Sequence, residues 1–180
     1  DVLSRMIYGA RNTLGIALAT TVLSFLLGGL LGMFAAVRGG WFDQVVGRIV
    51  DALMSVPTLI FALMLLAVFG KSVTNLIIII AMLDATRVFR LARAIALNIT
   101  VLDYVEVARL RGEGMNWIMI REILPNIMSP LIAEFGLRFS FVCLTISALS
   151  FLGAGIQPPA ADWGSMVAES KSLVTYGDLT

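Results

Sequence analysis

The sequence contains no histidine, a single cysteine and few charged residues. Only 14% of its 180 residues are Asp, Glu, Lys or Arg, whereas soluble proteins carry roughly 25%. Without histidine, a metal site or a catalytic triad built on that residue is excluded, and we expect no catalytic residue, metal site or bound cofactor. The lone Cys143 has no partner for an internal disulfide, and its apolar neighbours indicate a small buried side chain.

The charge pattern also gives no sign of nucleic-acid binding. The formal net charge is +1, and basic residues are not interleaved with aromatic ones in any patch. Hydrophobic residues make up 59% of the chain, and its mean hydropathy is +0.94, which indicates a membrane protein. The chain starts at Asp1 rather than at a methionine, and no signal peptide is visible. We therefore expect a piece of a longer protein, truncated at both ends.

Four long apolar stretches are candidates for membrane spans. They cover residues 13–37, 52–69, 73–89 and 126–152, and about 20 apolar residues cross a bilayer. A span must satisfy its backbone hydrogen bonds internally, so we expect helices and no sheet. The predicted fold is an all-α, multi-pass membrane protein, with residues 1–180 forming one transmembrane domain. Within the first span, Gly28 and Gly32 form a small-residue pair that lets another helix approach closely.

Four charged residues fall inside the predicted spans, namely Asp84, Arg87, Glu134 and Arg138. Arg87, Arg90 and Arg93 follow at helical spacing, and we expect them to form a solvated or headgroup-facing edge on a cytoplasmic extension of the third span. Asp84 lies in or just below the third span, where charges usually face the protein interior or water. Glu134 and Arg138 lie four positions apart in the fourth span and therefore share one helix face, on which they can pair. Two interpretations stay open for this pair: residues of a translocation pathway, or a structural ion pair near the cytoplasmic end.

Residues 103–126 are the longest polar interruption of the apolar chain. Their spacing predicts two short helices over residues 103–122, outside the bilayer, with a break near Gly112 and Gly114. Pro125 is expected to end the second helix at the residue before it. Val105, Ala108 and Leu110 are expected to form an apolar edge that enters a groove of a partner.

This segment resembles the EAA loop of the membrane subunits of binding-protein-dependent ABC importers. The matching residues are Glu106, Ala108, Gly112, Leu124 and Pro125. Two positions depart from the motif, since Val107 replaces an alanine and Glu122 stands where the motif has isoleucine. In that family the loop is a coupling helix that docks on a cytoplasmic ATPase subunit, so the resemblance implies an ATPase-coupling role for the five matching residues.

Two other segments are similar to the peptide and nickel branch of the same family. Residues 1–11 match the latter part of one of its motifs, and residues 153–166 match a pattern that contains Pro158-Pro159 and Trp163-Gly164 and ends at Met166. The two prolines predict a turn, with Trp163 as an anchor at the membrane interface. The resemblance implies a permease subunit in a bacterial-type inner membrane. It also implies cytoplasmic ATPase subunits, a second homologous permease subunit and an extracytoplasmic substrate-binding protein as partners. Dipeptides, oligopeptides, glutathione and nickel chelates are not distinguished.

The sequence has no nucleotide site of its own, which agrees with hydrolysis of ATP on a separate subunit. Gly70-Lys71-Ser72 resembles the end of a phosphate-binding loop, but Leu65 stands where that motif needs glycine. The positive-inside rule agrees with a cytoplasmic loop at 103–126, because the segments on that side carry most of the basic residues: Arg38, Arg48, Arg87, Arg90, Arg93, Arg109, Arg111 and Arg121, against Arg5, Arg11, Lys71 and Lys171 outside.

Two alternatives to an ATP-driven importer remain. One is a membrane channel or scaffold without energy coupling, which co-purification with an ATPase would distinguish. The other is an intramembrane enzyme. Such enzymes place serine, histidine, aspartate or metal ligands at membrane depth, and this chain has neither histidine nor a Gly-x-Ser-x-Gly motif.

Overall fold

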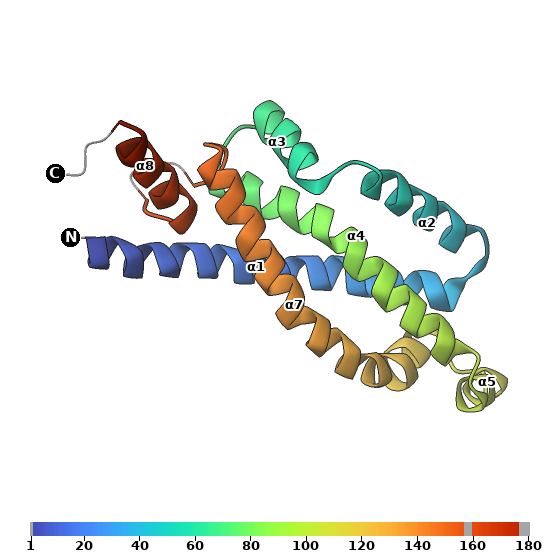
Figure 1. Ribbon diagram of the computed structural model, residues 1–180. Helices are drawn as coiled ribbons and strands as arrows, with labels where there is room; N and C mark the ends of the chain where they lie inside the picture. Colours follow the sequence, from blue (N-terminus) through green and yellow to red (C-terminus); the bar gives the residue numbers. More distant parts are fainter. Residues whose placement is uncertain (1, 157–159, 177–180) are drawn as a thin grey trace. The chain divides into compact units, whose positions relative to one another are not determined.

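The computed structural model describes residues 2–156 and 160–176, and these residues form helices joined by short connections without any strand (Figure 1). The all-α prediction is therefore confirmed. The predicted proline turn at Pro158 and Pro159 lies outside the described residues. In chain order the helices are α1 (Val2–Arg38), α2 (Gly40–Met54), α3 (Thr58–Phe69), α4 (Val73–Thr100), α5 (Asp103–Leu110), α6 (Met115–Trp117), the π-helix η1 (Ile118–Ile123), α7 (Leu124–Phe151) and α8 (Trp163–Tyr176).

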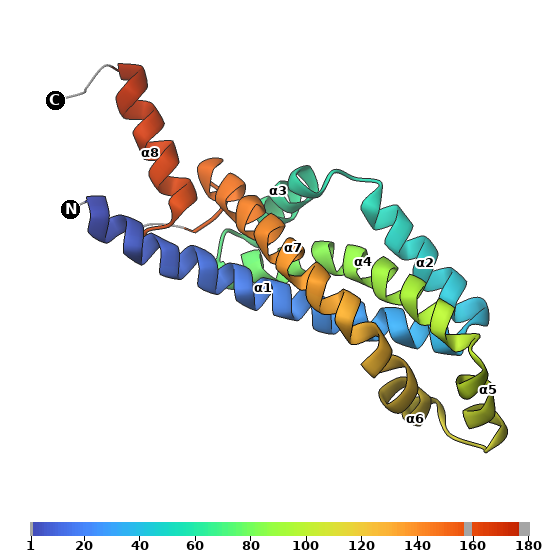
Figure 2. The same cartoon turned by 60° about the horizontal axis from the view of Figure 1, so that its bottom comes forward.

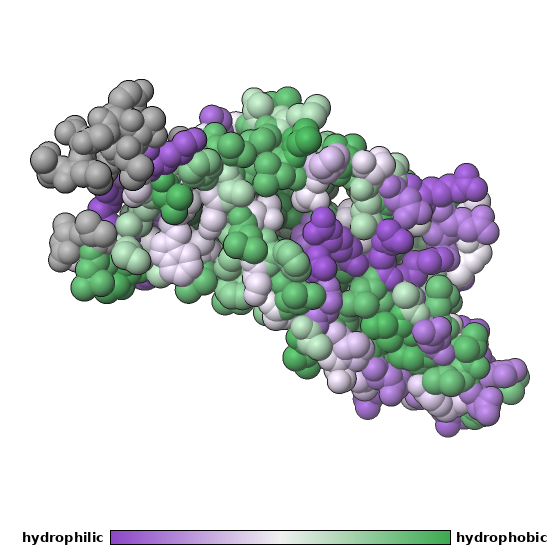
Figure 3. Space-filling view, in the orientation of Figure 1, coloured by the Kyte–Doolittle hydropathy of each residue, from purple (hydrophilic) through white to green (hydrophobic). Residues whose placement is uncertain are grey.

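The chain divides into two compact units. The first unit comprises Asp1–Thr21, Pro57–Ala81 and Phe139–Thr180, and the second comprises Val22–Val56 and Met82–Arg138. The long helices α1, α4 and α7 contribute residues to both. In Figure 3, apolar side chains dominate the first unit, whereas hydrophilic ones gather over α2 and around α5 in the second unit.

Three of the four predicted spans lie within continuous helices, namely 13–37 in α1, 73–89 in α4 and 126–151 in α7. The prediction of one helix over 52–69 is wrong, because α2 ends at Met54 and α3 begins at Thr58. Pro57 has no N–H to donate and restricts the preceding residue to an extended conformation. The Ser55 hydroxyl donates to the Ala52 carbonyl at 2.7 Å and closes the end of α2.

By length and composition, two helical stretches of the described chain can cross a membrane, Leu3–Arg38 and Met115–Phe151. A third is added if α2 and α3 together form one broken span. Charged residues interrupt the apolar part of α4 at Asp84, Arg87 and Arg90, so the total of four spans stays a prediction.

In the second unit, α1 and α4 pack closely at the two glycines singled out above. A Cβ atom built on Gly28 would lie 2.9 Å from both the Val88 Cβ and the Phe89 nitrogen. A Cβ atom on Gly32 would lie 2.6 Å from the Phe89 carbonyl oxygen. The structure confirms the predicted close approach of a second helix, since only glycine leaves space for α4 there.

In the first unit, α8 is attached to the first turns of α1. The Trp163 indole donates to the Met6 carbonyl at 3.2 Å, and the Asn12 amide donates to the Ala161 carbonyl at 2.8 Å. The fully buried Asp162 caps α8, because its Oδ2 accepts from the backbone N–H of Gly164 at 2.9 Å. Trp163 is 39% exposed.

Candidate functional site: a helical hairpin and a buried charge cluster

The helix α5 starts directly after α4 without a side-chain cap. The Leu102 carbonyl accepts from the backbone N–H groups of Val105 and Glu106 at 3.0 and 3.2 Å. Asp103 and Glu106 lie in the first turn of α5, where carboxylates interact favourably with the helix dipole. The Glu106 side chain is exposed and makes no capping hydrogen bond within the described chain.

The break after α5 falls at Gly112, as predicted. Its φ of +82° lies in the left-handed region that glycine adopts without steric cost. The Gly112 N–H donates to the Arg109 carbonyl at 2.9 Å, and the Glu113 N–H donates to the Ala108 carbonyl at 3.2 Å, which closes the C-terminus of α5. Gly114 has a φ of −71° and is not required to be glycine by the backbone.

The second helix of the segment does not end at Pro125. Instead α6, η1 and α7 form one continuous helical stretch from Met115 to Phe151, so the prediction of a helix end before the proline is wrong. In the π-helix the Leu124 N–H donates to the Met119 carbonyl, five residues back. This change of register places Pro125 at the start of a new α-helical ladder, where its missing N–H is tolerated.

The packing of α5 corrects the expected apolar edge. Val105 and Ala108 are fully buried in a core with residues of η1 and α7. They are therefore not available to enter the groove of a partner. The exposed apolar side chains of α5 are instead Tyr104, Val107 and Leu110, which are 40%, 50% and 80% exposed. In both ribbon views α5 lies at the end of α4, near α6 (Figures 1 and 2).

The five motif residues thus occupy different environments. Glu106 and Pro125 are exposed, Gly112 forms the turn, Leu124 is half-buried and Ala108 is part of the core. The hydroxyl of Tyr104 accepts a hydrogen bond from the Asn126 amide at 3.2 Å and joins α5 to the start of α7. The helical hairpin formed by α5, the turn at Gly112, α6 and η1 is consequently a packed unit rather than a loose loop.

A buried charge cluster lies further along α7. The Arg138 Nε donates to Glu134 Oε1 at 2.6 Å, which confirms the predicted pairing. Arg138 Nη1 also lies 3.7 Å from Asp84 Oδ1 on α4, and the Ser24 hydroxyl on α1 donates to Asp84 Oδ2 at 3.1 Å. Helical spacing does not predict that Ser24 and Asp84 join this pair, because the contact involves three separate helices.

A second ion pair joins α2 to α4. The Arg93 guanidinium donates to both carboxylate oxygens of Asp43, with 2.5 Å between Nη2 and Oδ2. Asp43 is buried, whereas Arg93 is about one-third exposed. The expectation that Arg87, Arg90 and Arg93 together form a solvated or headgroup-facing edge is therefore wrong for Arg93, while Arg87 and Arg90 are exposed.

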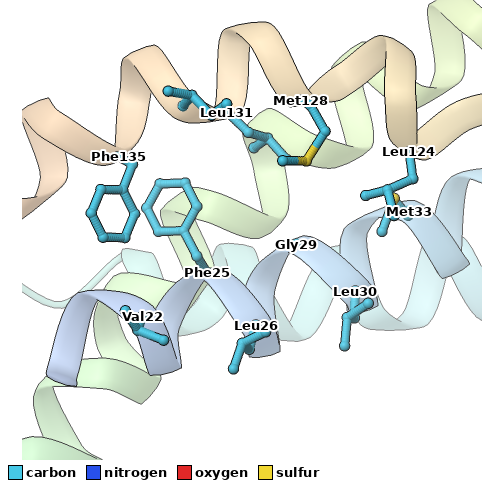
Figure 4. Close-up of a pocket in the computed structure, with 11 residues that line it drawn as sticks. Val22, Phe25, Leu26, Gly29, Leu30, Met33, Leu124, Met128, Leu131 and Phe135 are labelled. Carbon is cyan, nitrogen blue, oxygen red and sulfur yellow. The ribbon is translucent and has the colours of Figure 1, made fainter. Parts of the chain in front are cut away.

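An apolar groove of about 350 Å³ separates parts of α1 and α7 in the second unit. Phe25 of α1 and Phe135 of α7 meet edge to face at one end, with 5.1 Å between their ring centroids (Figure 4). Leu124 and Met33 approach each other at the other end. Between these contacts the two helices do not fill the space.

Comparison with known proteins identifies the class of this fold. Residues 28–177 match the family model described as binding-protein-dependent transport system inner membrane component. A solved structure titled as a crystal structure of an amino acid ABC transporter with histidines superposes with a TM-score of 0.63 at 22% identity, covering 97% of this chain and 81% of that one. At this identity the structural likeness supports the fold alone.

Curated relatives agree with the family model. The chain is 37% identical to the di/tripeptide transport system permease protein DppC of Pseudomonas aeruginosa, over 97% of this chain and 57% of that protein. It is 38% identical to a putative peptide transport system permease protein of Brucella suis, over 95% of this chain and 57% of that protein. It is 33% identical to the glutathione transport system permease protein GsiD of Pectobacterium atrosepticum, over 96% of this chain and 57% of that protein.

The chain therefore belongs to the family of inner membrane components of binding-protein-dependent transport systems. It spans a little more than half the length of the curated relatives that it matches. The family is one of transport permeases rather than enzymes, which stands against the intramembrane-enzyme alternative. The apolar helices and the family together identify an integral membrane protein.

Proposed function

We propose that this chain is part of the permease subunit of an ATP-driven importer that moves peptides or a related small solute across the bacterial inner membrane. The observation that carries the proposal is the helical hairpin of α5 and α6, found in a chain of the transport permease family. A channel or scaffold without energy coupling has no need for a packed hairpin with exposed apolar side chains. The subunit itself catalyses no reaction and binds no cofactor.

The hairpin is proposed to dock on a cytoplasmic ATPase subunit, which hydrolyses the ATP. Tyr104, Val107 and Leu110 provide the apolar contact, in the way that an amphipathic helix fills a groove. The exposed Glu106 pairs with a basic residue at the rim. Ala108, Leu124 and Pro125 act indirectly, since Ala108 and Leu124 belong to the core that fixes the direction of α5 relative to α7.

The transport path requires partners that this chain does not supply. We propose that a second homologous permease subunit completes the pore and that an extracytoplasmic binding protein delivers the solute. The names of the relatives support a peptide-like solute, including di- and tripeptides and glutathione. Nickel chelates, also implied by the sequence resemblance, are the second candidate for the transported solute.

The docking proposal is tested by placing a charge on the exposed edge of α5. Leu110→Asp changes a side chain that is 80% exposed, so the fold of the subunit should be unaffected. An aspartate in an apolar groove is unfavourable, and we expect at least a tenfold loss of ATPase subunits in pull-downs of the complete importer. The matched control is Val167→Asp, on α8 at 59% exposure.

The result is informative in both directions. Retention of the ATPase by the Leu110→Asp importer would contradict the docking proposal. Failure of the unaltered complex to import any peptide or glutathione with ATP and its binding protein would contradict the proposed function itself.

A further inference from the structure

The charge cluster of Ser24, Asp84, Glu134 and Arg138 places one guanidinium between two carboxylates of different helices. Arg138 binds Glu134 of its own helix tightly, with 2.6 Å between Nε and Oε1. Its Nη1 lies 3.7 Å from Asp84 Oδ1 of α4. The planar guanidinium carries five N–H donors and is suited to hold one carboxylate while facing another. The two carboxylates therefore compete for one cation, and Glu134 is the nearer of the two.

Asp84 belongs to a closely packed pair of helices. Its side chain is 7% exposed, and the Ser24 hydroxyl of α1 fixes Oδ2 at 3.1 Å. One turn further along both helices, Gly28 brings α1 into contact with the backbone of α4. Asp84 consequently moves with α1 and α4 together.

The pairing residues Glu134 and Arg138 belong to a helix with a looser attachment. Between α1 and α7 lies the apolar groove of about 350 Å³, which leaves α7 space to shift. Pro130 interrupts the hydrogen-bond ladder of α7, and the π-helical turn η1 precedes it. Prolines and π-helical turns are common sites of helix bending.

We propose that Arg138 exchanges Glu134 for Asp84 as its main partner during the transport cycle, so that the cluster is a charge latch between α7 and the α1–α4 pair. This inference rests on the proposed function. The exchange conserves the number of close ion pairs, because the guanidinium holds one carboxylate in each state. The released carboxylate keeps other polar surroundings: Asp84 keeps the Ser24 hydroxyl, and Glu134 is 24% exposed. The core that holds α5 contains residues of η1 and α7 and also of α1 and α4, so a displacement of α5 by the ATPase would reach both sides of the charge cluster.

A latch makes a prediction that a purely structural ion pair does not. Glu134→Gln removes the stronger competitor and should shift the equilibrium toward the state in which Arg138 binds Asp84. Asp84→Asn keeps a carbonyl oxygen for Ser24 but removes the charge, and it should shift the equilibrium in the opposite direction. A structural pair would instead lose stability in the same way with either substitution.

The measurement is a spin-label distance between α4 and α7 in the complete importer, assembled from the full-length chain with its partner subunits. Met82→Cys and Leu137→Cys supply the labels in a Cys143→Ser background, since both positions are at least half exposed. We expect the unaltered cluster to give different distances without nucleotide and with ATP trapped by vanadate. In the absence of nucleotide, Glu134→Gln should increase the population of molecules that show the distance of the vanadate-trapped state, and Asp84→Asn should decrease that population. Each substitution should change the ratio of the two populations by roughly threefold.

Glu169→Gln provides the matched control, because it neutralises a carboxylate of the exposed Arg5–Glu169 pair, and it should leave the distances unchanged. If Asp84→Asn fails to assemble, Ser24→Ala replaces it: loss of the hydroxyl makes Asp84 a stronger competitor for Arg138, so the shift should follow that of Glu134→Gln. The latch would be overturned if Asp84→Asn and Glu134→Gln changed the populations of the two spin-label distances in the same direction, or if neither substitution changed them. Failure of the proposed function is recognised separately, by absence of ATP-dependent uptake in the unaltered complex.

Discussion

Replacing Gly112 should weaken coupling through the turn that joins α5 to α6. Gly112 has a φ of +82°, and a Cβ atom there would meet nothing within 4 Å among the described residues. The cost of a substitution within the chain is therefore conformational rather than steric. An L-residue in the left-handed conformation costs about 1–2 kcal/mol, which corresponds to roughly 5- to 30-fold fewer molecules with the native turn.

A series of substitutions separates this strain from a clash with the ATPase. Asparagine and aspartate tolerate the left-handed region better than most residues with a side chain, so strain predicts the strongest effect for Gly112→Ala and milder effects for Gly112→Asn and Gly112→Asp. A clash predicts the order of side-chain size, with alanine mildest. Gly114→Ala is the control, because its φ of −71° suits any residue and its Cβ would meet no described atom within 4 Å.

The assay is solute uptake and substrate-stimulated ATPase activity of the complete importer in vesicles. Gly112→Asp should insert and assemble, and its binding protein should still load solute, while uptake falls. Normal coupled transport by this variant would refute the assignment of the segment as the coupling element. Loss of membrane insertion would show instead that Gly112 serves the fold alone.

Substitutions at three other places test the packing. Gly28→Ala should cost about 1–3 kcal/mol by overpacking and lower the thermal stability of the purified subunit, whereas Gly29→Ala, whose Cβ meets no described atom within 4 Å, should be neutral. Arg93→Leu leaves the buried Asp43 unpaired and should lower the melting temperature more than Asp43→Asn, which leaves a one-third exposed arginine; equal effects would contradict this. Asp162→Ala should remove about 1 kcal/mol of capping, and unchanged amide exchange at the start of α8 would be inconsistent with the cap.

The sequence was informative where one local rule decides the structure. Gly112 was predicted to break the hairpin because only glycine adopts a positive φ easily, and Gly28 and Gly32 were predicted to admit a second helix because they have no side chain. The Glu134–Arg138 pair followed from helical periodicity alone. Each of these predictions depends on neighbours within the same helix or turn.

Predictions failed where a residue's environment depends on distant parts of the chain. Pro125 did not end a helix, because the π-helical turn before it shifted the hydrogen bonds that the proline interrupts. Asp43 and Arg93 gave no sign of their pairing, since helical periodicity does not relate α2 to α4. Proline either bends or interrupts a helix, and local spacing around Pro57 does not decide between a bent helix and the interruption that is observed.

The burial of Val105 and Ala108 changes how the motif segment is understood to act. Had these side chains pointed outward, the contact with an ATPase would have depended on them, and only the turn at Gly112 would have joined α5 to η1. Instead they pack against Ile118, Ile123 and Ile127, so α5 and the first turns of α7 share one core. Close-packed cores resist deformation and transmit displacement. A force applied to the exposed Leu110 edge therefore reaches α7 directly through this core, and the small alanine at position 108 is required by the packing inside the subunit rather than by the partner.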